Sequence, residues 1–256
     1  MPVALSPLFA SGPVPAAGWL VVALLHALVI TALHRLPLLT PAGWAHAAAL
    51  GTVLWGCLGW RGWLAVVLYL AMGSAVTRLG LAWKTQAGLA EARGGRRGPE
   101  NVWGSAATGA VLALLAAALP ASRPLLLVGF AASFSAKFAD TCGSEIGKRW
   151  GGQPRLITTL RPVAPGSEGA VSLEGTLASV GGSLVMTALA AALGLIQGVA
   201  ALVAVVLAGL VATLLESVLG ATLQVRVTWL SNELVNALQT VAGALIAMGL
   251  WAAIAP

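Results

Sequence analysis

Charged residues are scarce in this chain. Asp, Glu, Lys and Arg together make up 9% of the 256 residues, against roughly 25% in a typical soluble domain. Hydrophobic residues make up 59%. This balance excludes an ordinary soluble fold, and we expect no nucleic-acid partner. We expect a chain of this composition to have the lipid bilayer as its partner.

Cysteine is scarce too, and so is charge near the N-terminus. Cys57 and Cys142 are too few and too far apart to predict a disulfide framework or a metal site. Residues 1–15 are uncharged and rich in Pro and Gly, without the basic region of a signal peptide. We therefore expect a short N-terminal tail, residues 1–16, followed by a helix that is retained.

Long apolar runs dominate the rest of the sequence. Runs of about 18 residues, nearly free of charge, are long enough to cross a bilayer core of roughly 30 Å. Since a chain in lipid must satisfy its own backbone hydrogen bonds, these runs predict helices. The predicted fold is all-α: one polytopic transmembrane bundle over residues 1–256 with about eight spans, seven to nine being compatible with the pattern. The expected spans are roughly 17–33, 43–58, 62–80, 103–119, 124–142, 173–194, 198–219 and 232–254.

The basic residues support an even number of spans. With eight spans, the connections of one side hold ten Lys and Arg: Arg35, Lys84, Arg93, Arg96, Arg97, Lys148, Arg149, Arg155, Arg161 and Arg226. The other side holds only Arg61 and Arg123. Basic connections face the cytoplasm. We predict outward termini and a multi-pass protein of a bacterial inner or thylakoid-type membrane.

Half of the acids lie in residues 133–176: Asp140, Glu145, Glu168 and Glu174. On a helical wheel, Ser133, Lys137, Asp140, Thr141, Ser144 and Glu145 share one flank of the helix that enters this stretch. A carboxylate in a membrane helix costs at least about 2.5–3.5 kcal/mol, so it normally faces a cavity or a partner. Asp140 and Glu145 are candidate Mg²⁺ ligands, because this ion prefers hard oxygens. The alternative is a carboxylate pair that Lys137 and Lys148 neutralise.

A glycine-rich loop runs into the next predicted helix. Gly166, Ser167, Glu168 and Gly169 are followed by Ser172. Such a loop offers backbone N–H groups and the positive end of a helix dipole to a phosphate. The alternative is an ordinary turn and helix N-cap. Within the helix, Gly175, Ser179 and Ser183 recur every four residues, which predicts close approach by another helix.

Three further polar groups lie on the same basic side. The loop 84–101 is either an anchor for anionic lipid headgroups or an arginine clamp for a triphosphate. Glu216 ends one apolar helix. Asn232 and Asn236 open the last span, where they serve either a site or hydrogen bonds between helices. Together these groups predict a site for Mg²⁺ and polyphosphate, with apolar helices behind it for a lipid tail.

Several blocks of this sequence resemble one family. They are Asp140-Thr141, Ser144-Glu145-Ile146-Gly147-Lys148, Leu156-Ile157-Thr158-Thr159, Pro165 to Ala170, Ser172 to Leu177, Glu216-Ser217, Gly220-Ala221-Thr222, and Asn232 with Asn236. The family is that of integral-membrane proteins which includes the phytyl-phosphate kinases of plants and cyanobacteria. The resemblance implies phosphorylation of an isoprenoid monophosphate to the diphosphate by a nucleoside triphosphate, a step of phytol salvage for tocopherol synthesis. One departure is Pro165, where a basic residue is expected; Arg155 or Arg161 would have to substitute for it.

The resulting hypothesis is a Mg²⁺-dependent prenyl-phosphate kinase, a phosphotransferase with phytyl phosphate as acceptor and CTP as the favoured nucleotide. The expected catalytic residues are Asp140, Glu145, Lys137 and Lys148, and the expected metal ligands are Asp140 and Glu145 with Glu174 or Glu216. The expected substrate and nucleotide contacts are Lys84, Arg97, Asn101, Thr141, Ser144, Arg155, Thr158, Thr159, Arg161, Gly166, Ser167, Glu168, Gly169, Ser172, Asn232 and Asn236.

Two other functions stay open on the sequence alone. A transporter or flippase of an anionic lipid would also place carboxylates in membrane helices. A cytidylyltransferase that makes a CDP-lipid would need the same phosphate-binding groups. The prenyl chain length and the oligomeric state are not determined by the sequence.

Overall fold

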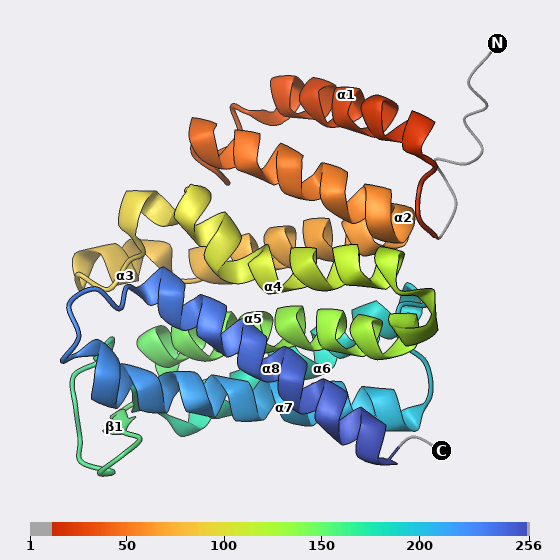
Figure 1. Cartoon of the computed structure of the whole chain (residues 1–256). Coiled ribbons are helices and arrows are strands. Elements are labelled where there is room, and N and C mark those ends of the chain that lie inside the picture. Colours follow the sequence, from red (N-terminus) through yellow and green to blue (C-terminus); the bar gives the residue numbers. More distant parts are fainter. Residues whose placement is uncertain (1–11, 255–256) are drawn as a thin grey trace.

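The computed structural model describes residues 12–254 and is almost wholly helical (Figure 1). This confirms the all-α, polytopic prediction. The helices are α1 (Ala16–Leu33), α2 (Pro41–Arg78), α3 (Leu81–Gln86), α4 (Pro99–Ala118), α5 (Arg123–Trp150), α6 (Leu173–Ala192), α7 (Val199–Leu219) and α8 (Asn232–Ile254). Two-residue strands, β1 (Arg155–Leu156) and β2 (Ala170–Val171), pair antiparallel between α5 and α6.

Helix α2 is a hairpin whose two halves, before and after Gly59, are each long enough to cross a membrane. Its 38 residues would measure about 57 Å if straight, nearly twice the bilayer core. At Gly59 the backbone leaves the helical region (φ 71°, ψ −171°), a conformation that glycine adopts easily. The Arg78 guanidinium donates to the Pro37 carbonyl at 2.6 Å, so the two ends of α2 meet. Seven helices within residues 12–254 are long and apolar enough to span, and α2 raises the crossings to the predicted eight.

Most predicted boundaries lie within a few residues of the observed ones, but two do not. Helix α4 begins at Pro99 rather than near 103, because Pro99 occupies its first turn and the Asn101 side chain accepts from the Gly98 N–H at 2.9 Å. Helix α5 runs to Trp150 rather than ending near 142. Its polar last turns stay helical because their charged side chains have partners, described below. The single-domain assignment stays a prediction, and the predicted tail lies mostly outside the described residues.

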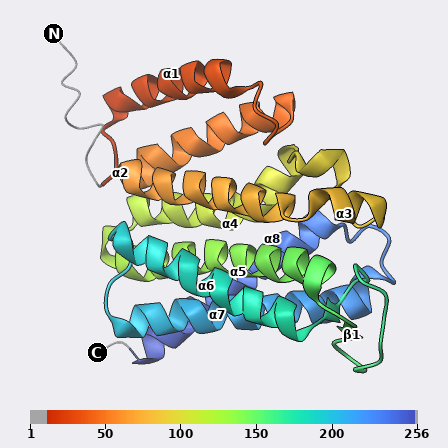
Figure 2. The same ribbon diagram turned by 180° about the vertical axis from the view of Figure 1, so that it is seen from behind.

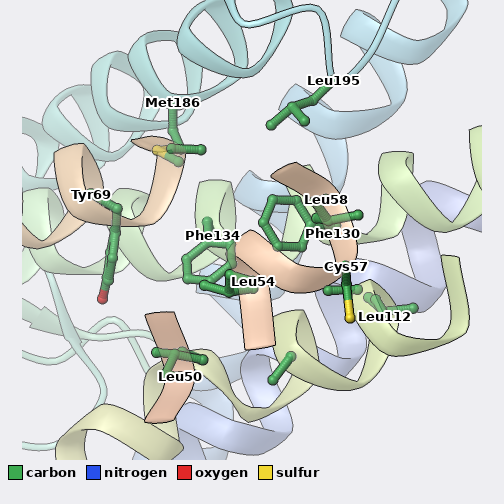
Figure 3. Packing of buried hydrophobic residues seen from close by; sticks show 14 of the residues in the cluster. Leu50, Leu54, Cys57, Leu58, Tyr69, Leu112, Phe130, Phe134, Met186 and Leu195 are labelled. Carbon is green, nitrogen blue, oxygen red and sulfur yellow. The ribbon is translucent and has the colours of Figure 1, made fainter. Parts of the chain in front are cut away.

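Helix α5 is the centre of the bundle, with α2, α4, α6, α7 and α8 packed around it (Figures 1 and 2). Phe130 and Phe134 of α5 are fully buried among Leu54, Leu58 and Met186 (Figure 3). Helix α6 approaches α5 closely at the predicted small-residue stripe, since a Cβ on Gly175 would lie 2.9 Å from the Gly143 carbonyl oxygen of α5. It also does so at a glycine outside that stripe. A Cβ on Gly182 would lie 3.1 Å from both the Ala139 Cα and the Phe138 carbonyl oxygen of α5.

The two ends of the bundle differ. The start of α1 and the end of α8 lie at one end, whereas α3, β1 and the first turns of α4 and α8 lie at the other (Figures 1 and 2). This agrees with an even number of crossings. Helix α1 lies at the edge of the bundle and packs mainly against α2.

Candidate functional site

A cavity of about 560 Å³ lies where α4, α5, α6, α7 and α8 meet the connections 91–97 and 165–172. Its volume is typical of ligand-binding pockets, which measure roughly 300–1,000 Å³. Sixteen of the residues predicted from the sequence line it: Arg97, Asn101, Lys137, Asp140, Thr141, Ser144, Glu145, Lys148, Gly166, Ser167, Glu168, Gly169, Ser172, Glu216, Asn232 and Asn236.

One group of charges forms around Lys137. Its ammonium is buried and donates to the Asp140 carboxylate at 2.5 Å and to the Asn236 amide oxygen at 2.9 Å. Glu216, on α7, lies within the electrostatic reach of Asp140, Lys137 and Glu168. Three carboxylates from different elements, Asp140, Glu168 and Glu216, therefore line the cavity. Such a concentration of negative charge suits a bound cation.

A second group is a chain of alternating charges. The buried Glu145 carboxylate bonds the buried Lys84 ammonium and, at 3.2 Å, the Lys148 ammonium. Lys148 in turn bonds Glu91 at 3.1 Å. The sequence hypothesis assigned Asp140 and Glu145 to one metal ion. In the structure they belong to separate groups, and each has the lysine neighbour that the neutralised-pair alternative predicted.

The pKa values of two carboxyl groups in the connections, Glu91 and Glu168, are shifted in opposite directions. Burial alone would raise the pKa of Glu91, but the Lys148 ammonium outweighs it and holds that pKa below its usual range. Burial raises the pKa of Glu168; the Lys148 charge works against this, whereas the negative charges of Asp140 and Glu91 add to it. Glu168 therefore takes up a proton at a higher pH than an ordinary glutamate.

The structure does not bring six of the predicted site residues to the cavity, and their role stays a prediction: Lys84, Arg155, Thr158, Thr159, Arg161 and Glu174. Lys84 is held by Glu145 and by the Thr77 carbonyl, to which it donates at 2.7 Å. Arg155 donates to the Leu160 carbonyl at 2.8 Å within its own exposed connection. Neither Arg155 nor Arg161 supplies the basic residue that Pro165 replaces. Glu174 is exposed because its neighbour Gly175 faces α5.

The glycine-rich loop matches the turn and N-cap alternative in part. The Ser172 hydroxyl accepts from the Gly175 N–H at 3.1 Å and caps α6. Both the N–H and the hydroxyl of Ser167 donate to the Ala164 carbonyl, at 3.2 and 2.8 Å. The donors of Ser167 are thus used within the turn. The backbone of Gly166 and Gly169 still lines the cavity.

Five residues of the wall were not named singly as site residues: Glu91, Arg93, Arg96, Ser105 and Glu233. The first three lie in the loop 84–101, one interpretation of which was a triphosphate clamp. Arg93 contacts Glu100 and donates to the Asn101 amide oxygen at 2.9 Å, while Asn101 donates to Glu233 at 3.1 Å. Arg93 adopts a left-handed conformation (φ 57°) followed by two glycines with positive φ. One sequence feature could have indicated this part of the wall: the run Arg93-Gly94-Gly95-Arg96-Arg97. Its consecutive glycines allow the backbone to turn back toward the bundle and bring the arginines to the cavity.

No three His, Cys, Asp or Glu side chains among residues 12–254 converge closely enough to hold a metal by themselves. Mg²⁺ is usually bound by one or two carboxylates together with water and substrate phosphates. Asp140 with Glu216 or Glu168 is a donor set of that kind, so the residues fit the ion as a partner of bound phosphate.

Comparison with known proteins identifies the family. The family model described as "Integral membrane protein DUF92" matches residues 24–244. The chain belongs to this family. The DUF92 match covers most of α1 through most of α8 and therefore includes the whole cavity. No solved structure matches the chain.

Three relatives of this chain come from a cyanobacterium, a plant and an archaeon. An uncharacterized membrane protein of Synechocystis sp. is 49% identical over 235 residues, which are 91% of each chain. Protein VTE6, chloroplastic, of Arabidopsis thaliana is 40% identical over 215 residues, 82% of this chain and 64% of the relative. An uncharacterized membrane protein of Methanocaldococcus jannaschii is 28% identical over 200 residues, 78% of this chain and 80% of the relative. The predicted resemblance to plant and cyanobacterial membrane proteins is confirmed.

Proposed function

We propose that this protein is a kinase that transfers a phosphoryl group from a nucleoside triphosphate to an isoprenoid monophosphate, with phytyl phosphate as the favoured acceptor. The observation that carries the proposal is the cavity in which lysines, arginines and carboxylates converge at one end of an apolar bundle. Membership of the DUF92 family and the 40% identity to protein VTE6 support it, as do the sequence blocks that resemble phytyl-phosphate kinases.

The triphosphate, with CTP favoured, would lie among the cations of the 91–97 connection and the end of α5. Arg93, Arg96 and Lys148 line that part of the wall, and arginine forks match phosphate oxygens. The Glu91 carboxylate would leave Lys148 when a phosphate binds, since the two anions compete for one ammonium.

Asp140 and Glu216 would hold Mg²⁺, with Glu168 close by. Bound there, the ion would neutralise charge on the phosphate oxygens. Lys137 would orient Asp140 and add a positive charge next to the reacting groups, and Asn236 would keep the lysine in place. Glu145 acts in this proposal through Lys148, which it positions by their 3.2 Å contact.

The reaction needs no general base from the protein. The second pKa of a phosphate ester is about 6, so the attacking oxygen of the acceptor is already ionised near neutral pH. That oxygen forms a bond to the γ-phosphorus as the bond from this phosphorus to the β–γ bridging oxygen breaks, and the nucleoside diphosphate leaves with the electron pair. The chain's task is positioning and charge neutralisation.

The cavity would face the cytoplasm of a bacterial inner membrane or the corresponding side of a thylakoid-type membrane. The support is the excess of Lys and Arg at that end of the bundle. The relatives of this chain include a chloroplast protein and a cyanobacterial membrane protein.

The test is a product assay with purified protein, phytyl phosphate, CTP and Mg²⁺. We expect phytyl diphosphate and CDP, and a loss of at least about 100-fold in rate when Asp140→Asn and Glu145→Gln are combined. Glu174→Gln is the matched control, because it makes the same chemical change on an exposed turn outside the cavity. Release of pyrophosphate, or substrate uptake into vesicles without nucleotide, would contradict the kinase.

A further inference from the structure

A second cavity, of about 260 Å³, lies between α1, both halves of α2 and the start of α4. Its wall is made mainly of Leu, Ile, Val and Trp side chains. Three residues, Arg97, Asn101 and Ser105, line both this apolar cavity and the polar one. The two cavities therefore adjoin at the N-terminal end of α4.

We infer that the apolar cavity takes the hydrocarbon chain of an isoprenoid monophosphate whose phosphate lies at Arg97. The inference rests on the proposed function and adds to it the place and direction of the acceptor. A ligand with one anionic end and one long apolar end matches two adjoining cavities of opposite character.

Arg97 has the properties of a phosphate contact at this junction. Its guanidinium donates to the Tyr69 hydroxyl at 3.2 Å, and Gly73 leaves room for it, since a Cβ there would lie 2.9 Å from Nη2. The cavity cations Lys137, Lys148 and Arg93 each bond a carboxylate. Arg97, like Arg96, bonds none among residues 12–254, and of these two only Arg97 lines both cavities, so its charge is available to an anion at the junction.

Trp44 offers a second donor in the wall of the same apolar cavity. It lines the apolar cavity, and its indole Nε1 is buried without a hydrogen-bond partner in the described part of the chain. A buried indole N–H normally has a partner. The neighbouring Gly43 touches the backbone of Arg97, because a Cβ on it would lie 2.5 Å from the Arg97 carbonyl oxygen. A phosphate oxygen at the junction would complete the contacts of both side chains.

From the junction the apolar cavity extends into the membrane part of the bundle. Its wall on α2 runs from Trp44 to Leu54, about 15 Å along a helix, and His26 and Trp63 line it as well. Leu50 and Leu54 belong to the cluster of buried hydrophobic residues, whereas the hydroxyl of Tyr69 lies at the edge of this cluster (Figure 3). The polar end of the path is thus marked by Tyr69 and Arg97.

The experiment is photo-crosslinking with phytyl phosphate that carries a diazirine at the far end of its chain. We expect peptides of α1 and the first half of α2 to be labelled, and unlabelled phytyl phosphate to compete. Ala47→Trp should reduce this labelling about tenfold, because an indole in the cavity wall displaces several methylenes of the chain. Ala45→Trp on the exposed face of the same helix is the control and should leave labelling unchanged.

If Ala47→Trp proves unstable in detergent, Ala47→Leu gives a smaller loss in the same direction. Labelling confined to the outer faces of α6, α7 or α8, or labelling that is not competed, would overturn the inference. The assay does not depend on turnover. Competed labelling of α1 and α2 without any phosphoryl transfer would therefore refute the kinase function but support the binding site for the hydrocarbon chain. Full kinase activity together with unaltered labelling in Ala47→Trp would support the kinase function but refute that binding site.

Discussion

At the scale of single residues, the charges inside this protein are stabilised by one another. Lys84 and Glu145 have side chains only 1% and 3% exposed, and they come from different helices. Removing one partner of such a pair leaves the other buried and uncompensated, whereas replacing both with apolar groups is often neutral. The pair therefore joins the short helix α3 to the central α5.

We predict that Lys84→Met lowers the free energy of unfolding by up to about 3 kcal/mol, since Lys148 still partly compensates Glu145. Lys84→Met combined with Glu145→Met should recover most of this loss. Thermal unfolding of the detergent-solubilised variants measures both effects. Thr85→Met, at the exposed neighbouring position, is the control. Equal stability of the single variant and the wild type would contradict a structural role for the pair.

A second prediction concerns pH and Glu91. Because Lys148 holds the pKa of Glu91 below its value in the unfolded chain, their contact stabilises the fold above about pH 4.3 and is lost as the pH falls through the lower folded pKa. The Glu91 side chain is 49% exposed, so solvent screening limits the effect to below about 1 kcal/mol.

Glu91→Gln should therefore lower the melting temperature slightly at pH 7, and the difference from the wild type should shrink progressively as the pH falls below about 4.3. Glu174→Gln is the matched control, because it makes the same chemical change at an exposed carboxyl without an ion pair in the described chain. A constant difference between Glu91→Gln and the wild type across this range would show that the carboxylate does not titrate against Lys148.

The sequence predicted much of this site because helical periodicity determines which residues share a face. Lys137, Asp140 and Ser144 were placed on one flank, and all three line the cavity. Periodicity does not determine which partner a charge finds 61 residues away, as Lys84 finds Glu145. For the same reason the hypothesis could not separate Asp140 from Glu145, nor exclude Glu174.

At the scale of helices, glycine sets the distance between α5 and α6. Gly182 touches the α5 backbone, whereas a Cβ on the adjacent Gly181 would meet nothing within 4 Å. The two glycines are chemically identical neighbours, but they lie about 100° apart around the helix axis, and only Gly182 faces α5. The spacing of small residues predicted that another helix approaches α6 closely. Only the structure shows that Gly182, and not Gly181, makes the contact with α5.

We predict that Gly182→Ala destabilises the protein by about 1–3 kcal/mol, because the added methyl overpacks the contact with Ala139. Gly181→Ala should be neutral or stabilising by up to about 1 kcal/mol, since alanine favours helix. Melting temperatures of the two variants, measured side by side, test the prediction. Similar values for both would show that α5 and α6 can separate without cost.

At the scale of the whole molecule, the distribution of positive charge leads to a predicted topology with both termini outward. This prediction is possible because the charge bias is summed over all connections and needs no knowledge of their paths. The folded path of each connection was beyond such reasoning. Glu91 meets Lys148 across 57 residues of sequence, and no local pattern indicates that contact.

The topology can be tested with two cysteine variants. Ala87→Cys lies in the connection after α3 and Ala121→Cys in the turn between α4 and α5, and both positions are exposed. The native Cys57 and Cys142 are buried. A membrane-impermeant maleimide should label Ala87→Cys only in vesicles that expose the cytoplasmic face and Ala121→Cys only in the opposite orientation. Labelling of both from one side would refute eight crossings.

The length of α5 has a consequence for how the reaction relates to the bilayer. Its 28 residues measure about 42 Å, roughly 12 Å more than the hydrocarbon core. If α5 enters the core near Arg123, its last two turns, with Glu145 and Lys148, stand above the hydrocarbon. The helix then fixes the level of Glu145 and Lys148 relative to the membrane surface, with Asp140 just inside the hydrocarbon boundary, whatever the length of the chain anchored below. Substrates of different tail length would meet the same reacting groups at the same level.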